Sequence, residues 1–252
     1  MWIDSPSDLQ IPQLRQLWKI AFGDSDAFLD SFFRTAFSPD RCRCVLKENR
    51  VAAVLYWFDC MVEDQKFAYI YAVATHPDFR NQGICRKLME NTHAVLSQQG
   101  YSGVVLVPQK ESLRNMYAGM GYRDCGGLTL IQCCAGENPV SVRAIGAEEF
   151  ASLRQQFLPA GSVVQEGENL EFLSEQLQFF SGPGFLLAAY IEDDSLHGIE
   201  LLGDSAAAPG IVKALNCTSG TFRIPGQAIP FAMFHPLTET AAEPSYFGFA
   251  FD

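Results

Sequence analysis

The chain has 252 residues, a length that suits one large or two modest folded domains. Hydrophobic residues make up 48% and charged residues 19%, a composition that excludes a disordered chain. The net charge of −11 falls entirely on residues 136–252. Because such a surface repels phosphates, we do not expect nucleic acid as a partner. The sequence has no apolar run of about 18 residues and no signal-peptide pattern, so we expect no membrane span and a cytoplasmic location.

Hydrophobic periodicity predicts two helices at the start of the chain. The apolar spacing between Leu9 and Phe22 is helical, and Gly23 ends this first helix. Asp24 or Ser25 then caps a second helix that runs to about residue 37. The rest of the first half is predicted as a hairpin of strands 42–46 and 51–58, strand 67–75, helix 84–99, strand 104–107, helix 112–120 and strand 128–133.

The second half repeats the opening order of the first. Its predicted elements are strand 140–144, helices 147–157 and 169–180, strands 185–191 and 196–202, a loop over 204–210, and strands near 211–217, 228–234 and 245–251. No long helix there matches helix 84–99. We therefore predict two related units, residues 1–135 and 136–252, divided at the turn-like segment 135–139.

The cysteines and histidines do not form a metal-binding pattern. Cys42 and Cys44 are two residues apart and Cys133 and Cys134 are adjacent, so neither pair has the spacing of a zinc site. The four histidines are scattered along the chain. We therefore predict no metal site and interpret the eight cysteines as small buried apolar residues.

One segment has the features of an anion site. Residues 80–86 lead from a predicted strand into the start of the long helix. The first N–H groups of a helix lack partners and the helix dipole is positive there, so such a segment binds a pyrophosphate. Gly83 lets the backbone approach the anion, and Arg80 and Arg86 add positive charge. The chain has no dinucleotide-binding fingerprint, P-loop or nucleophile elbow.

The sequence of this segment, Arg80-Asn81-Gln82-Gly83-Ile84-Cys85, resembles the R/Q-x-x-G-x-G/A loop of the GNAT superfamily of N-acetyltransferases. The segment 117–122, which begins with Tyr117, resembles the Y-x-x-x-G-F/Y element of that family and follows in the expected order. The resemblance covers residues 1–134 well, and the second half resembles a degenerate unit without the loop. This tandem plan is similar to the amino-terminal two-thirds of Eis-like acetyltransferases. It implies an α/β (α+β) fold with a mixed, mostly antiparallel sheet flanked by helices.

The resemblance implies acetyl-CoA as co-substrate, held between strands 67–75 and 104–107. The pantetheine amides would pair with the backbone near Val73 and Thr75, and the pyrophosphate would lie on the amides of residues 81–86. Cys85 stands where the family usually has Gly or Ala, but it is small enough to leave these amides accessible. The predicted cofactor-binding residues are Val73, Ala74, Thr75, Arg80, Asn81, Gln82, Gly83, Ile84, Cys85 and Arg86.

Tyr117 is the predicted catalytic residue. In direct transfer an amine attacks the thioester and a thiolate leaves, and a phenol beside the sulfur can donate a proton to that thiolate. The general base is not identifiable from the sequence. Asp59, Glu63 and Asp64 are interpreted as solvated hairpin charges, whereas Asp252 is a weak candidate, because the terminal carboxylate enters the active site in Eis-like relatives. Tyr56, Trp57 and Phe58 either line an acceptor pocket or pack in the core.

The favoured function is N-acetyl transfer from acetyl-CoA to a primary amine, on a small molecule or a peptide. The alternative is a non-catalytic acyl-CoA-binding or regulatory module, and a third possibility is a purely structural protein with an accidental loop. The identity of the amine, the oligomeric state and the identity of the acyl group stay open at this point.

Overall fold

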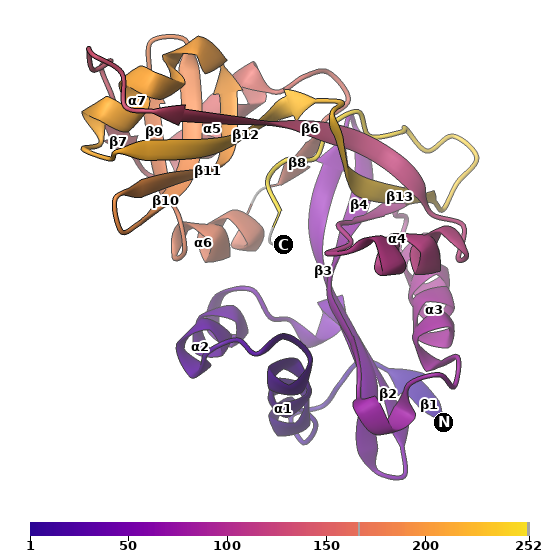
Figure 1. The fold of residues 1–252 in the computed structure, drawn as a ribbon. Coiled ribbons are helices and arrows are strands. Elements are labelled where there is room, and N and C mark those ends of the chain that lie inside the picture. Colours follow the sequence, from indigo (N-terminus) through magenta and orange to yellow (C-terminus); the bar gives the residue numbers. More distant parts are fainter. Residues whose placement is uncertain (166, 251–252) are drawn as a thin grey trace.

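One mixed sheet runs through both halves of the chain (Figure 1). The computed structural model describes residues 1–165 and 167–250, and within these residues the sheet has 13 strands. The strands are β1 (Trp2–Asp4), β2 (Cys42–Lys47), β3 (Arg50–Val62), β4 (Gln65–Thr75), β5 (Gly103–Leu106), β6 (Arg123–Cys134), β7 (Arg143–Ile145), β8 (Val163–Gln165), β9 (Gln178–Gly182), β10 (Phe185–Glu192), β11 (Ser195–Gly203), β12 (Ser219–Gly226) and β13 (Ile229–Pro236). The helices are α1 (Ile11–Phe22), α2 (Asp26–Thr35), α3 (Ile84–Gln98), α4 (Glu111–Ala118), α5 (Ala147–Phe157), α6 (Glu168–Ser174), α7 (Ala208–Ala214) and the 3-10 turns η1 (Pro39–Arg41), η2 (Pro77–Phe79) and η3 (Ser205–Ala207).

The strand order joins the two halves. It is β1-β2-β3-β4-β5-β13-β6-β12-β11-β10-β9-β7, with β8 paired to β3 outside this path. The strand pairs β4–β5 and β11–β12 are parallel and the other strand pairs are antiparallel, so the predicted fold class is confirmed. Strand β13 comes from the second half but lies between β5 and β6. The second half therefore completes the sheet of the first, and the division at residues 135 and 136 stays a prediction.

Helices cover both faces of the first half of the sheet. In β3, Val54, Tyr56 and Phe58 pack on the side of α1 and α2, whereas Leu55 and Trp57 pack on the side of α3 and α4. This explains the unbroken apolar run in β3, since a strand covered on both faces has no polar side. Tyr56, Trp57 and Phe58 are each 2% exposed or less. They belong to the core, so the suggestion that they line an acceptor pocket is wrong.

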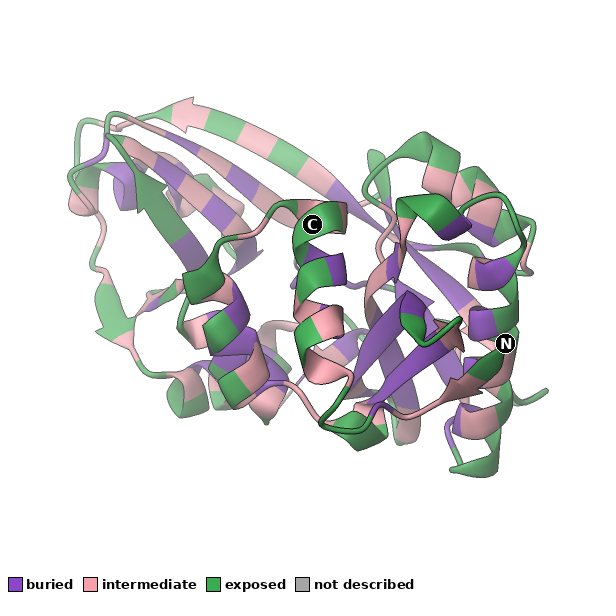
Figure 2. Cartoon of the chain, turned by 90° about the horizontal axis from the view of Figure 1, so that it is seen from below, coloured by how far each residue is buried: buried purple, intermediate pink, exposed green. Residues whose placement is uncertain are grey.

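Aromatic contacts pack the two halves against each other. The rings of Phe32 and Phe172 lie 5.5 Å apart, and those of Tyr69 and Phe247 lie 4.8 Å apart. The same apolar cluster includes residues of α1, α2, α5 and α6. In Figure 2 the buried residues are concentrated in the strands and along the inner sides of the helices. The halves therefore share one core between them.

Three predicted elements of the second half differ from the structure. Residues 208–214 form α7 instead of the end of a loop and the start of a strand, and their buried Ile211 and Val212 pack on β12. Helix α6 ends at Ser174, and Phe179 and Phe180 lie in β9, where they enter clusters on opposite faces of the sheet as strand periodicity requires. Residues 245–250 are irregular, and residue 251 lies outside the described residues. Short apolar runs fit both helix and strand, which explains these errors.

The cysteines are free thiols, and Cys42, Cys44, Cys60, Cys125 and Cys217 are buried. Cys85 and Cys133 are half-buried and Cys134 is exposed, so the interpretation as buried residues is wrong for these three. Within residues 1–165 and 167–250, no group of three or more His, Cys, Asp or Glu side chains could hold a metal ion. In the same part of the chain, no helix has the length and apolar character needed to cross a membrane.

Candidate active site

Strands β4 and β5 pair along only part of their length. Phe67–Tyr69 of β4 lie beside residues 103–105 of β5, after which β4 continues to Thr75 while β5 ends at Leu106. A bulge bends β4 at this point, because its register against β3 shifts and Ala72 has a φ of 48°. A cavity opens where the two strands separate, lined by residues 69–73 and 106–109.

Beyond the bulge, every second residue of β4 directs its backbone N–H and C=O groups away from β3, toward the side where β5 no longer pairs with β4. The N–H of His76 donates to the carbonyl of Ala52 at 2.9 Å, and Ala74 lies opposite residue 54 of β3. Since ladder bonding alternates along an antiparallel strand, Ala74 and His76 pair with β3 and the backbone groups of Val73 and Thr75 face away from it. This arrangement suits the predicted pairing with pantetheine amides at Val73 and Thr75. Ala74 instead directs its backbone toward β3.

The segment between η2 and α3 presents backbone N–H groups to solvent. Asn81 and Gly83 have φ values of 59° and 69°, and no atom lies within 4 Å of the position that a Cβ on Gly83 would occupy. The first intrahelical bond runs from the N–H of Lys87 to the carbonyl of Gly83 at 3.2 Å. The N–H groups of residues 84–86 therefore have no intrahelical partner, and the first turn of α3 contains no acidic residue. An anion meets aligned donors and a positive helix dipole here.

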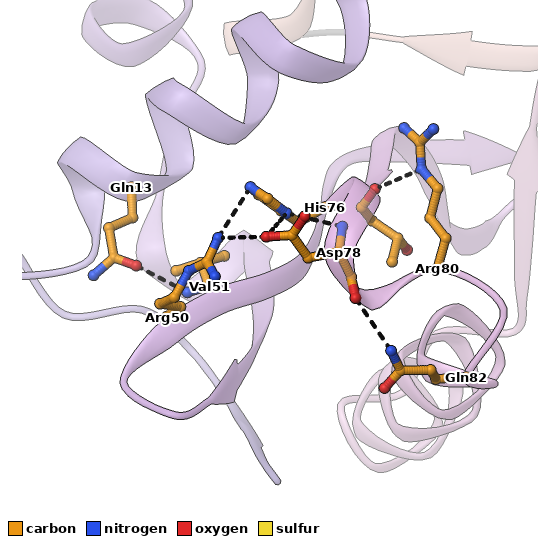
Figure 3. Close-up of polar contacts among 8 residues, drawn as sticks. Gln13, Arg50, Val51, His76, Asp78, Arg80 and Gln82 are labelled. Carbon is orange, nitrogen blue, oxygen red and sulfur yellow. Dashed lines mark hydrogen bonds and ion pairs between the residues drawn. The ribbon is translucent and has the colours of Figure 1, made fainter.

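The side chains of this segment hold the loop in shape (Figure 3). Arg80 Nε donates to the carbonyl of Thr75 at 3.1 Å, and Gln82 Nε2 donates to the carbonyl of Asp78 at 3.2 Å. Gln82 Oε1 in turn accepts from Lys47 Nζ at 2.8 Å. These contacts fix the backbone, and they keep two cations, Arg80 and Lys47, beside it. The prediction that residues 80–86 bind a cofactor therefore concerns mainly their backbone N–H groups.

Arg86 links the loop to the helix that contains Tyr117. Its guanidinium donates to the carbonyl of Gly119 at 2.9 Å, which is the residue that follows α4. Helix α4 has no basic residue in its own last turn, so Arg86 supplies the positive charge that its carboxyl end favours. The first turn of α3 and the end of α4 are thereby joined by one side chain.

Tyr117 lies in the wall of the cavity and is 6% exposed. Burial raises the pKa of its phenol, and the neighbouring Cys85 adds to this effect, so the hydroxyl is protonated at neutral pH. Burial also raises the pKa of the Cys85 thiol to about 11, which leaves Cys85 uncharged. The phenol of Tyr117 is therefore a proton donor held at the edge of a cavity, near the loop that we expect to bind the cofactor.

The cavity has a volume of about 470 Å³ and lies between the two halves. Its first-half wall comes from α1, α2 and a residue between them, β4, β5 and the residues after it, and α4. Its second-half wall comes from α6 and the residues after it, β10, β11, β12 and residue 250. Aromatic residues dominate one end: Trp18, Phe22, Phe28, Tyr69 and Tyr71. A volume of this size accommodates a small organic molecule or one end of a larger one.

Asp24 lies among these aromatic rings. Its Oδ2 accepts a hydrogen bond from Trp18 Nε1 at 2.7 Å. Burial and, second, the charge of Asp24 raise the pKa of the neighbouring Tyr71. Asp24 is the only carboxylate, and Arg223 the only cation, among the described residues that line the cavity. A carboxylate surrounded by aromatic faces attracts an ammonium group.

Asp59, Glu63 and Asp64, the other described carboxylates considered from the sequence, do not line the cavity. Asp59 accepts from the hydroxyl of Tyr101 and lies 3.3 Å from Lys66 Nζ, and Glu63 and Asp64 are exposed at the turn after β3. Asp252 lies outside the described residues. Asp24 was predicted only as a possible helix cap, a role that Ser25 takes by accepting from the N–H of Phe28 at 3.2 Å. The signal that points to Asp24 is a carboxylate between two helices rich in aromatic residues.

Comparisons with known proteins agree with this geometry. Residues 3–125 match a family model described as an acetyltransferase (GNAT) domain. The fold is similar to a GCN5-related N-acetyltransferase from Kribbella flavida at 17% identity and a TM-score of 0.75, covering 97% of this chain and 73% of that one. It is also similar to Eis1 from Mycobacterium abscessus at 9% identity and a TM-score of 0.69, covering 94% and 74%. At these identities the likeness concerns the fold alone. The comparison with curated proteins gives no match.

Proposed function

We propose that this chain, whose residues 3–125 match a GNAT acetyltransferase domain, transfers an acetyl group from acetyl-CoA to a primary amine by direct attack. One observation carries the proposal. The separation of β4 and β5 opens a cavity whose wall includes Tyr117. The side chain of Arg86 connects the first turn of α3, where the free N–H groups lie, to the end of the helix that contains Tyr117. A loop that suits a diphosphate and a proton donor are thus joined at one site.

The residues present suit a coenzyme A thioester. The N–H groups of residues 84–86 and the open space beside Gly83 favour the diphosphate. Arg80 and Lys47 lie nearby and carry the opposite charge to the diphosphate. The backbone of Val73 and Thr75 is turned to the side where the pantetheine would lie. When bound, acetyl-CoA supplies an activated acyl group as its thioester.

The residues of the cavity divide the proton transfers between them. Asp24 attracts the ammonium form of the acceptor and is the carboxylate in the cavity wall to which the amine proton can pass. The amine nitrogen then attacks the thioester carbonyl, a C–N bond forms and the C–S bond breaks. The nitrogen passes its second proton to water as the neutral amide forms, and water returns a proton to Tyr117 after the following step. Tyr117 donates its phenolic proton to the departing thiolate, since burial keeps that phenol protonated beforehand.

The aromatic end of the cavity favours an amine that carries an apolar group. Trp18 and Tyr71 neighbour Asp24 and Phe28 lines the same cavity, and aromatic rings bind both alkyl ammonium groups and apolar bodies. We therefore propose a small-molecule or peptide amine with an apolar or aromatic substituent as the acceptor class.

A thiol-release assay tests the function. Purified protein is supplied with acetyl-CoA and a panel of primary amines that includes 2-phenylethylamine, spermidine and alanine amide. We expect amine-dependent release of CoA thiol, with 2-phenylethylamine among the better acceptors. Stabilisation of the protein by CoA without turnover of any amine would instead support a binding module, because a ligand at about 100 times its Kd adds roughly 2.7 kcal/mol of stability.

A further inference from the structure

A buried ion pair lies beside the cavity wall in the second half. Arg154 of α5 donates two hydrogen bonds to Glu200 of β11, at 2.6 Å and 2.9 Å, and the two side chains are 3% and 0% exposed. Ile199, the neighbour of Glu200 in β11, lines the cavity. The register of β11 against β10 shifts between residues 198 and 200, so Ile199 is the extra residue of a bulge, and it packs on the same apolar cluster as Ala188, the partner of Glu200 in β10. The ion pair therefore adjoins the cavity wall on the same side of the sheet.

The pair also holds the segment of residues 246–250. The hydroxyl of Tyr246 donates to Glu200 Oε1 at 3.1 Å, and this tyrosine is 2% exposed. The guanidinium of Arg154 lies 5.3 Å from the ring centroid of Phe249. Ala250, the next residue, lines the cavity. The segment thus runs from the ion pair to the cavity wall.

Strand β8 holds the same segment through its backbone. The N–H of Val163 donates to the carbonyl of Tyr246 at 2.8 Å, and Gln165 Nε2 donates to the carbonyl of Phe249 at 2.7 Å. Strand β8 itself pairs with β3 of the first half. The segment is therefore held by both β11 and β8, and β8 links it to the first half.

The chemistry of the pair indicates what it provides. Two charges taken out of water lose hydration that their attraction only partly restores, so apolar residues of similar size often give equal stability. An ion pair differs from apolar packing in being directional, since a bidentate guanidinium and carboxylate fit in one relative position. The hydrogen bond from the Tyr246 hydroxyl to Glu200 then fixes the segment of residues 246–250 relative to the pair.

We infer that Arg154, Glu200 and Tyr246 are positioning residues that set the place of residues 246–250, and with them one wall of the acceptor end of the cavity. The inference rests on the proposed function, because it assigns this wall to the amine. The residues do not touch the loop that we expect to bind the cofactor, so their effect is expected on the acceptor and not on CoA.

The test compares three proteins with the wild type. Tyr246→Phe removes the hydroxyl and keeps the ring, and the double variant Arg154→Met with Glu200→Leu replaces the whole pair without leaving an unpaired charge. Glu149→Gln is the matched control, since it breaks an ion pair that α5 makes with Arg143 at the surface. The measurements are hydrogen exchange of residues 246–250, the thermal shift caused by CoA, and the KM for 2-phenylethylamine.

We expect faster exchange at residues 246–250 and a KM raised at least about fivefold in Tyr246→Phe and in the double variant, because small misplacements at a site cost up to about 100-fold. The CoA shift should stay that of the wild type, and Glu149→Gln should match the wild type throughout. Unchanged exchange would show that Arg154, Glu200 and Tyr246 do not anchor residues 246–250. Faster exchange with an unchanged KM would show that this anchor has no role at the acceptor site. A wild type that acetylates no amine contradicts the proposed function, whereas the exchange result still decides whether the anchor exists.

Discussion

The indole nitrogen of Trp18 donates to Oδ2 of Asp24 at 2.7 Å and fixes a carboxylate at the aromatic end of the cavity. Asp24→Asn keeps the shape of the side chain and removes its charge. We expect the KM for 2-phenylethylamine to rise at least about tenfold, since a hydrogen bond to a charged group contributes roughly 1.5–3 kcal/mol and tenfold corresponds to about 1.4 kcal/mol. The thermal shift caused by CoA should be unaffected. Steady-state kinetics with varied amine provide the measurement.

Asp26→Asn is the control for this prediction. Asp26 lies two residues further on, has an exposed side chain and forms its ion pair with Lys19 away from the cavity. Its replacement should leave the KM unchanged. An equal rise in both variants, or none in Asp24→Asn, would mean that Asp24 does not bind the amine.

Tyr117→Phe removes the proposed proton donor and retains the ring in the cavity wall. General acid catalysis contributes typically 10²–10⁴-fold, so we expect kcat to fall by at least about 100-fold while the affinity for CoA is retained. The measurement is kcat from thiol release together with the CoA thermal shift. A kcat equal to that of the wild type would remove Tyr117 from the mechanism.

Tyr56→Phe is expected to stabilise the protein. The hydroxyl of Tyr56 is buried and has no hydrogen-bond partner among the described residues, and its burial raises the pKa of the phenol well above the ordinary value. Removing an unsatisfied buried polar group recovers its desolvation penalty, about 1–3 kcal/mol. Urea unfolding should show a higher midpoint with an unchanged slope, and activity should stay that of the wild type. A lower midpoint would show that the hydroxyl contributes to stability.

His93 makes the folded protein sensitive to acid. Its ring stacks on His235 at 4.4 Å and its Nε2 lies 2.7 Å from the hydroxyl of Tyr122. Burial and, second, His235 lower the pKa of His93 to about 3 from an ordinary 6.5. Between pH 3 and pH 6.5 His93 is protonated in the unfolded chain but neutral in the folded protein. The stability that the folded protein has with neutral His93 is therefore complete above pH 6.5 and is lost as the pH falls below that value.

His93→Gln should reduce this sensitivity, because glutamine does not titrate. From pH 7 to pH 5 the wild type is expected to lose about 2 kcal/mol more stability than the variant, at about 1.4 kcal/mol per pH unit below about 6.5. Urea unfolding at the two pH values measures the difference. Equal losses in the two proteins would show that His93 is protonated as readily in the folded protein as in the unfolded chain.

The sequence predicted the parts of the site that local chemistry specifies. Helix α3 begins at Ile84 as its periodicity indicated, and Gly83 has the left-handed backbone that makes a loop of this kind possible. Tyr117 could be singled out as a candidate because its motif lies within one short helix and the turn after it. Signals of this range are contained in a few consecutive residues.

The acceptor end of the cavity could not be predicted in this way. The wall of the whole cavity combines Trp18 and Asp24 with Arg223 and Ala250, which are far apart in the chain and come together only in the fold. The position of β13 between β5 and β6 has no local signal either. Strand pairing between distant segments depends on the whole core, so the ion pair of Arg154 and Glu200 was also invisible in the sequence.

Calorimetric titration of acetyl-CoA into the wild type, Gly83→Glu and Gly100→Glu tests the central claim most directly. Gly83 and Gly100 lie at opposite ends of α3, both have a positive φ, and neither has an atom within 4 Å of the position that a Cβ would occupy. The two substitutions therefore impose similar backbone strain, but only Gly83→Glu places a carboxylate where we expect the diphosphate. We expect binding to the wild type and Gly100→Glu and none to Gly83→Glu. Equal binding by all three proteins, or binding by none, would contradict this expectation.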